Sequence, residues 1–296
     1  MGSSPTGRTP MNRLPILCTL LALLLPTLAA AAQAATLDRI RETGEVRVGY
    51  RTDLPPFSRG VANEDPQGFS IDLCRRVFDR IREREGLDGL ALRFVPVTAG
   101  DRLTAIEDGR IDIECGGTTV TLSRLERVDF SSLFYASGTS FLSARPGAID
   151  ALDDLEGRSV AVLDETTTRS VLRERLSAEG VAAKLVVVPD HATSMALLEG
   201  GEVDAVAGDR ATLLALAAGS AALRAGNLSP LMLSFEPYAF PVPRDDADFR
   251  LAVNRSLAGI YRDGEVGRLW QKWFAELEAQ PTRFLLFLYQ LNALPE

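Results

Sequence analysis

Strand-like and helix-like segments alternate along almost the whole chain, and this alternation constrains the fold more than any other feature. A first series predicts strands over residues 46–50, 92–97 and 109–115, with helices from Ser70 and over 101–107. A second series predicts strands over residues 159–163, 184–188 and 203–207, with helices over 168–179, 193–199 and 210–218. Strands that alternate with helices are typical of α/β domains. The sequence therefore predicts two α/β lobes.

Two extended segments are placed to connect these lobes. Residues 139–144 end in the turn Arg145-Pro-Gly147, and residues 237–243 contain prolines, which disfavour helix and favour extended chain. We expect the chain to cross to the second lobe through the first segment and to return through the second. Two amphipathic helices are predicted after the return, over residues 246–261 and 265–277.

The segment 117–131, with the sequence GTTVTLSRLERVDFS, brings a strand end, a glycine turn and a helix start together. Ser123-Arg-Leu-Glu126 has the pattern of a capping box, which predicts that a helix begins there. Free backbone N–H groups and the positive end of the helix dipole favour negative charge, and Arg124 adds a planar guanidinium suited to a carboxylate. The segment indicates an anion site. The alternative is that Arg124 is a solvated surface residue beside ordinary capping threonines.

The N-terminus has the three parts of a secretory signal peptide: Arg13, the apolar run 14–32, and the small-residue site Ala32-Gln-Ala34. We expect residues 1–34 to be a signal peptide with an N-terminal extension, cleaved near Ala34 and Ala35, and the mature protein to be periplasmic. Met11 is an alternative start to Met1. The other interpretation is a membrane anchor, against which Pro15 and Pro26 argue.

Composition excludes some partners. The chain has 40 acidic and 32 basic residues, so its formal net charge is −8, and we expect no binding to nucleic acid or anionic lipid. Cys74 and Cys115 remain after cleavage, and in an oxidising compartment they predict a disulfide between the first long helix and the strand before the anion motif. Two buried thiols are the alternative. With one histidine there is no Cys/His cluster, so we expect no metal site and no cofactor.

Ordered landmarks then reveal a resemblance. Among them are Gly44-Glu-Val-Arg-Val-Gly-Tyr-Arg51, Gly68-Phe-Ser-Ile-Asp-Leu73, Asp112-Ile-Glu-Cys-Gly-Gly-Thr-Thr119, Asp129-Phe-Ser131 and Lys272-Trp-Phe274. From about Leu37 to about Pro281 the chain resembles the polar amino-acid-binding branch of the periplasmic solute-binding proteins of ABC importers, and most of all the glutamate/aspartate-binding proteins. The resemblance implies an α/β, two-lobed periplasmic-binding-protein fold with two crossover strands (type II). It divides the chain into lobe 1 (35–143), lobe 2 (144–237) and a return to lobe 1 with a C-terminal tail (238–296).

The resemblance also implies roles for individual residues. Arg124 would bind the α-carboxylate of the ligand with Thr119 and Thr166, and Asp209 would bind its α-ammonium group. Three side chains would form a cationic set for the ligand's own side chain: Arg51, Arg102 and His191. The alternatives are a helix cap for Asp209, a surface residue for His191 and solvated residues for Arg51 and Arg102.

Three departures from the glutamate/aspartate pattern put the ligand side chain in question. Ala99 and Gly117 stand where close relatives have hydroxyl residues, and Glu165 stands where the family usually has glycine. Losing two hydroxyl donors would weaken a distal carboxylate contact, each neutral hydrogen bond contributing on the order of 1 kcal/mol. The ligand stays open between glutamate, aspartate and a neutral polar amino acid such as glutamine.

We expect a monomeric binding protein that delivers an amino acid to the membrane permease of an ABC importer, without catalysis. A dehydratase-like enzyme is the main alternative, because the superfamily includes dehydratases. The sequence has no nucleophile elbow, P-loop or dinucleotide-binding glycine pattern to support it. A ligand-sensing receptor domain is the other alternative, because the same fold serves in signalling proteins.

Overall fold

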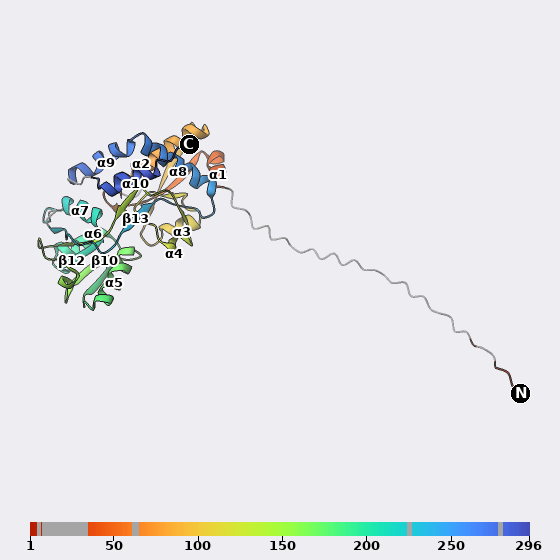
Figure 1. Cartoon of the computed structure of the whole chain (residues 1–296), viewed down its shortest axis with the longest axis horizontal. Coiled ribbons are helices and arrows are strands. Elements are labelled where there is room, and N and C mark those ends of the chain that lie inside the picture. Colours follow the sequence, from red (N-terminus) through yellow and green to blue (C-terminus); the bar gives the residue numbers. More distant parts are fainter. Residues whose placement is uncertain (5–6, 8–34, 61–64, 224–226, 278–280) are drawn as a thin grey trace. The chain divides into compact units, whose positions relative to one another are not determined.

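The computed structural model of the chain describes residues 1–4, 7, 35–60, 65–223, 227–277 and 281–296 (Figure 1). The predicted apolar run 14–32 and the cleavage site at Ala34 lie outside the described residues. Within the described part, no helix is both long enough and apolar enough to span a bilayer.

A parallel sheet of order β4-β1-β5 is the centre of the first lobe. Along β1, Val46, Val48 and Tyr50 are buried, since alternate residues of a strand share one face. The strands are β1 (Glu45–Arg51), β4 (Ala91–Val97) and β5 (Ile113–Glu114), and the hairpin β2 (Asp53–Leu54) and β3 (Ser58–Arg59) follows β1. The helices before the crossing are α1 (Thr36–Thr43), α2 (Phe69–Glu85), α3 (Arg102–Glu107) and α4 (Leu122–Leu125).

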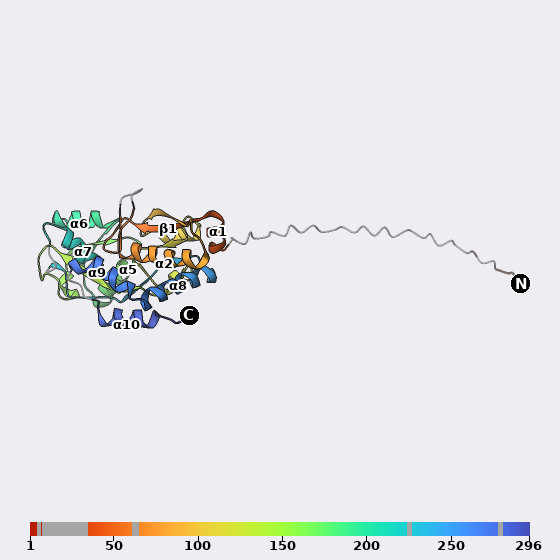
Figure 2. The same cartoon turned by 90° about the horizontal axis from the view of Figure 1, so that it is seen from above.

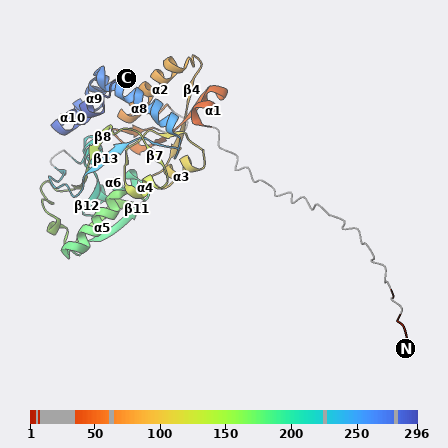
Figure 3. The same cartoon turned by 45° about the vertical axis from the view of Figure 1, so that its right-hand side comes forward.

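The return segment completes this lobe with α8 (Ala247–Arg262), α9 (Glu265–Phe274), a 3-10 turn (Ala275–Leu277) and α10 (Arg283–Asn292). Helix α2 packs against α8 and α9, although it is far from both in the sequence, and the three helices lie in the upper part of Figure 3. Helix α10 packs along α8 (Figure 2). The rings of Tyr261 and Tyr289, one from each helix, are stacked with their centroids 5.2 Å apart. The two amphipathic helices predicted from the sequence correspond to α8 and to α9 with its 3-10 turn.

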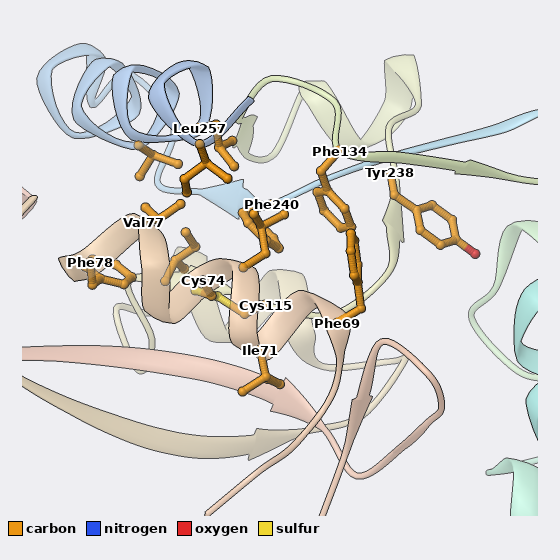
Figure 4. Packing of buried hydrophobic residues seen from close by; sticks show 14 of the residues in the cluster. Phe69, Ile71, Cys74, Val77, Phe78, Cys115, Phe134, Tyr238, Phe240 and Leu257 are labelled. Atoms are coloured by element: carbon orange, nitrogen blue, oxygen red, sulfur yellow. A yellow bond between two sulfur atoms is a disulfide. The ribbon is translucent and has the colours of Figure 1, made fainter. Parts of the chain in front are cut away.

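Cys74 of α2 and Cys115, which follows β5, form the disulfide that the sequence predicts. Their Cα atoms are 6.1 Å apart and both side chains are buried. Figure 4 shows the bridge inside the core of the first lobe, beneath Phe240 and Leu257 of the return segment. Tyr238 belongs to the same cluster, but its hydroxyl points away from it (Figure 4).

The second lobe has a sheet of order β11-β10-β12-β9, in which only β9 is antiparallel to its neighbour. Val160 and Val162 pack with Leu172 of α5, whereas Ala161 packs with Leu198 of α6 and with residues of α7. Alternation along β10 therefore buries both faces of this sheet under helices. The strands are β9 (Thr139–Ser143), β10 (Ser159–Leu163), β11 (Lys184–Val188) and β12 (Ala205–Asp209); the helices are a 3-10 turn (Leu152–Leu155), α5 (Thr167–Glu179), α6 (His191–Glu199) and α7 (Arg210–Gly219).

Between the two sheets, β13 (Glu236–Ala239) pairs with β6 (Thr118–Thr119) and β8 (Tyr135–Ser137), and β14 (Pro241–Val242) pairs with β7 (Asp129–Phe130). The chain passes from β8 directly into β9 at Gly138. A Cβ atom on Gly138 would lie 2.3 Å from the carbonyl oxygen of Ser234, so glycine lets the outgoing and returning segments approach closely. Strand β9 is hydrogen bonded in the second sheet. The division at residues 143 and 237 stays a prediction, and the lobes are named here by their sheets.

The anion motif differs locally from its prediction. Helix α4 begins after Thr121, whose hydroxyl accepts a hydrogen bond from the Arg124 backbone N–H at 3.2 Å. The predicted capping box at Ser123 is wrong, because Thr121 caps the helix two residues earlier and Glu126 follows it. The predicted strand over 109–115 is also shorter, since only Ile113–Glu114 pairs with β1.

Candidate functional site

A cavity lies between the carboxyl ends of the strands of the two lobes. It is lined by all seven residues that the resemblance assigns to the ligand: Arg51, Arg102, Thr119, Arg124, Thr166, His191 and Asp209. The other lining residues are Leu54, Gly117, Leu163, Thr167, Thr168, Ala207 and Gly208. The structure brings the predicted set together from segments that are up to about half the chain apart. Their individual roles stay predictions.

Arg124 belongs to a group of residues that we call the proximal end, because the resemblance assigns it to the α-carboxylate and α-ammonium groups of the ligand. Its Nη1 atom donates to the carbonyl oxygen of Thr119 at 2.8 Å. Helix α4 has only four residues, so its dipole is small and the guanidinium carries most of the positive charge at this end. Burial lowers the pKa of Arg124, yet arginine stays protonated in proteins. The group can therefore bind a carboxylate with two parallel hydrogen bonds.

Asp209 faces Arg124 from the end of β12. Burial, and secondly the nearby Glu236 carboxylate, raise the pKa of Asp209 to about 7. The hydroxyls of Tyr238 and Ser137 oppose this shift. Oδ1 of Asp209 is buried without a well-oriented hydrogen-bond partner among the described residues. A cationic group placed beside this carboxylate would supply the missing donor and restore its charge.

Glu236, at the start of β13, is a part of the proximal end that the sequence reasoning missed. Glu236 is 2% exposed, and its carboxylate accepts hydrogen bonds from four hydroxyl groups. Thr119 donates to Oε2 at 2.7 Å, and Thr167 donates to the same oxygen. Thr139 and Ser234 donate to Oε1 at 3.0 and 2.9 Å. The only signal in the sequence was an acidic residue directly before the proline-rich return segment.

The hydroxyl of Thr166 makes two hydrogen bonds within the protein. It donates to the carbonyl oxygen of Leu163 at 2.8 Å and accepts from the Arg169 N–H at 3.3 Å, which caps α5. The hydroxyl proton is therefore committed within the protein. The backbone N–H of Thr166, at the start of a helix of 13 residues, is the group that can reach a ligand carboxylate.

A second group of residues lines the same cavity, and we call it the distal end because the resemblance assigns it to the ligand side chain; Arg102 belongs to it. Its Nε atom donates to Thr118 Oγ1 at 2.8 Å, and that hydroxyl donates to Glu114 Oε2 at 2.8 Å. Burial raises the pKa of Glu114 and lowers that of Arg102 to about 9, so Arg102 remains charged at neutral pH. Nη1 of Arg102 is buried and has no hydrogen-bond partner in the described part of the chain.

Arg51 and His191 complete the distal end. Arg51 forms an ion pair with Asp53 at 2.6 Å, and the other oxygen of Asp53 lies 3.4 Å from the backbone nitrogen of His191 in the opposite lobe. Burial lowers the pKa of His191 to about 4. Burial therefore favours the neutral imidazole in the ligand-free protein, and the place of His191 in the cationic set stays a prediction.

The three departures from the family pattern have structural consequences. A Cβ atom on Gly117 would lie 2.9 Å from the ring of Tyr238 and 3.0 Å from Leu54. Tyr238 and Leu54 therefore leave little space for a side chain at position 117. Ala99 is buried. Glu165 is exposed and has a φ of 53°, a left-handed conformation that favours glycine. It lies near Gly100 across the cleft, at the rim of the distal end.

No group of His, Cys, Asp and Glu side chains in the described residues is arranged to hold a metal ion. The cavity is instead lined by three arginines, Arg51, Arg102 and Arg124, and by the carboxylate of Asp209. Charges of both signs at the proximal end complement a zwitterion.

Two α/β lobes joined by crossing strands, with a polar cavity between them, define a type II solute-binding protein. Residues 46–276 match the family of bacterial extracellular solute-binding proteins, family 3, and the chain belongs to that family. Its members and relatives are binding proteins rather than enzymes.

Curated relatives and solved structures agree with this family. The L-glutamate/L-aspartate-binding protein of Pseudomonas aeruginosa is 32% identical over 256 residues, covering 86% of this chain and 85% of that protein. The ABC transporter glutamine-binding protein GlnH of Bacillus subtilis is 25% identical, covering 83% of this chain and 86% of that protein. The crystal structure of the ancestral amino acid-binding protein AncCDT-1, a precursor of cyclohexadienyl dehydratase, is 29% identical with a TM-score of 0.69, covering 81% of this chain and 99% of that chain. The chain is an amino-acid-binding protein of an ABC importer.

Proposed function

We propose that the cavity binds an acidic amino acid, glutamate or aspartate. The observation that carries this proposal is the buried Nη1 donor of Arg102, which lacks an acceptor among the described residues. Arg102 lines the cavity together with Arg51. A second carboxylate would satisfy the Nη1 donor. The similarity to the Pseudomonas aeruginosa protein supports the same ligand class.

At the proximal end, Arg124 and the backbone N–H of Thr166 would bind the α-carboxylate, and Asp209 would bind the α-ammonium group. Thr119 takes a different part from the one first expected. Because its hydroxyl proton is donated to Glu236 at 2.7 Å, its oxygen can only accept a further hydrogen bond. We therefore assign the Thr119 hydroxyl to the ammonium group rather than to the carboxylate.

At the distal end, Arg102 would bind the side-chain carboxylate together with Arg51. His191 would contribute a neutral N–H group or, once the ligand's negative charge is beside it, a proton of its own. Closure of the lobes would remove the carboxylates and the ammonium group of the ligand from water. In the closed cavity each of these charges would be stabilised by an opposite charge of the protein.

We infer the export and the cellular location of the protein from its sequence. The chain would be exported with cleavage near Ala34, act in the periplasm as a monomer, and deliver its ligand to the membrane permease of an ABC importer. These statements rest on the N-terminal pattern and on the family.

A thermal-shift screen of the mature protein against the common L-amino acids tests the ligand. A ligand that binds only the folded protein, at about 100 times its dissociation constant, adds roughly 2.7 kcal/mol of stability. We expect L-glutamate or L-aspartate to give the largest rise in melting temperature. If no amino acid raises the melting temperature, the proposed function is wrong.

Glutamine is the second candidate. The neutral state of His191 and the glutamine-binding relative favour it, because an amide oxygen can also accept from Arg102. In the same screen, a larger shift with L-glutamine than with L-glutamate would select this alternative.

A further inference from the structure

The carboxylate of Glu236 accepts hydrogen bonds from residues of both lobes. Glu236 lies on β13, which is hydrogen bonded to the first-lobe strand β6, and the nearest first-lobe donor is Thr119 on that strand. Thr167, the first residue of α5 in the second lobe, donates to the same oxygen, Oε2. The two hydroxyl oxygens are 3.3 Å apart. One carboxylate oxygen is therefore the point at which hydroxyls of both lobes meet.

The remaining donors are near the hinge. Thr139 and Ser234 donate to Oε1, and the Thr139 backbone N–H donates to the Ser234 hydroxyl at 2.9 Å. Gly138, between β8 and β9, packs against Ser234. These contacts lie where the chain crosses between lobes, so a hinge rotation changes them little. Thr167 is carried by α5, and a rotation that opens the cavity withdraws it from Glu236.

The chemistry of the carboxylate makes this contact strong. In the described part of the chain, hydroxyl groups rather than a lysine or arginine satisfy Glu236. A buried carboxylate loses its hydration, and each donor that binds the charge contributes more than a donor in a neutral pair. Removal of one donor leaves a buried charge with fewer hydrogen bonds, and the protein then loses the free energy that compensates for the desolvation of that charge.

We propose that Glu236 is the acceptor of an interlobe latch that stabilises the closed form. In the closed form the Thr167 hydroxyl binds Oε2, and Glu236 also orients the Thr119 hydroxyl with its oxygen toward the cavity. Glu236 is thus a positioning residue that acts through these threonines. This inference rests on the proposed closure around an amino acid, and the second measurement below separates the failure of one from the failure of the other.

The first test is a double-mutant cycle on ligand dissociation, with L-glutamate and L-glutamine as probes. Thr167→Val removes the second-lobe donor at nearly constant volume, and Glu236→Gln removes the charge at constant shape. We expect each variant to raise the dissociation rate about tenfold, with the association rate changed less than about twofold. In the Glu236→Gln background, Thr167→Val should add less than about twofold.

Matched controls come from the same helix. Ser170→Ala and Glu174→Gln remove a hydroxyl and a carboxylate from exposed positions of α5, and both should leave the rates unchanged. If Thr167→Val has the same effect with and without the Glu236 carboxylate, Thr167 contacts the ligand directly and the latch is refuted. If Glu236→Gln does not fold, the Thr167→Val dissociation rate alone decides, and an unchanged rate refutes the latch.

The second measurement needs no ligand. Spin labels at Glu83→Cys on α2 and Arg173→Cys on α5, both exposed, report the separation of the lobes, because the native Cys74 and Cys115 are bridged. Thr167→Val and Glu236→Gln should both shift the distance distribution of the ligand-free protein to longer separations. If no amino acid binds but these shifts occur, the latch stands and the proposed function fails. Unshifted distributions refute the latch.

Discussion

The two ends of the cavity satisfy their polar groups in different ways. At the proximal end, Arg124 is anchored to the Thr119 carbonyl and Glu236 has four hydroxyl donors. At the distal end, Arg102 Nη1 and His191 Nδ1 are buried without hydrogen-bond partners in the described residues. Asp209 Oδ1 at the proximal end also has no partner among the described residues, so this end needs a donor from a ligand, whereas Arg102 at the distal end needs an acceptor.

This difference separates recognition of any amino acid from recognition of a particular one. The α-carboxylate and α-ammonium groups are common to all amino acids, and Arg124 and Asp209 are the partners that we propose for them. The side chain meets unpaired donors, and a site of buried donors rejects a ligand that lacks the matching acceptor. Selectivity should therefore depend on the distal residues, and affinity on both sets.

The largest effect is expected at the proximal end. Arg124→Ala should weaken binding of every amino acid by about a thousandfold or more, because it removes a buried bidentate partner and leaves the α-carboxylate unpaired. Isothermal titration with acidic and neutral amino acids measures the loss. Arg127→Ala, three residues further on at an exposed position, is the matched control. Binding of a neutral amino acid that survives Arg124→Ala would break the comparison.

Binding should depend on pH through Asp209. Its pKa of about 7 is raised above its ordinary value of 3.8. Protonation of Asp209 therefore stabilises the folded, ligand-free protein. This stabilisation is fully present below pH 3.8 and is lost as the pH rises to about 7. The ligand ammonium needs the ionised form. Affinity should therefore rise about tenfold per pH unit from about pH 5 to about pH 7 and then level off.

Titrations across this range in the wild type and in Asp209→Asn test the assignment. The variant should bind more weakly at high pH and lose the dependence on pH, for acidic and neutral ligands alike. A pH profile that is the same in the variant would assign the titrating group elsewhere in the site.

At the distal end, Arg102→Gln should weaken L-glutamate binding by about thirtyfold but L-glutamine binding by less than about threefold, because only the charged ligand needs the guanidinium. Competition binding with both ligands gives the ratio directly. Arg110→Gln, an exposed arginine near α3, serves as the control. Equal losses for both ligands would remove the functional division between the two ends.

The smallest effect is expected at the rim. Glu165→Gly relieves a left-handed backbone at φ 53° and should stabilise the fold by about 1 kcal/mol. Since the Glu165 carboxylate is an attractive partner for Arg102, its removal should strengthen L-glutamate binding by about twofold. Thermal melts and titrations measure the two effects separately. A lower melting temperature would show that the Glu165 side chain makes a stabilising contact.

Local patterns predicted the elements well. The strands Ser159–Leu163 and Lys184–Val188 end where the sequence places them, and α7 begins at Arg210 as expected. These boundaries depend on alternation and on turn residues close in the chain. The cap of α4 was misplaced because Thr121 and Ser123 are both good caps, and only backbone geometry selects between them.

The sequence by itself determined the two series of strands and helices and the two cysteines available for a disulfide, and its resemblance to a family implied the arginine and aspartate set. Tertiary structure alone decided how those groups are paired. Glu236 and Thr119 are 117 positions apart, and no local pattern relates them. Because the Thr119 hydroxyl donates its proton to Glu236, it can only accept a hydrogen bond from a ligand. In the same way, burial of His191 favours its neutral form. Hydrogen-bond direction and protonation depend on neighbours in space, and those are set only when the two lobes meet.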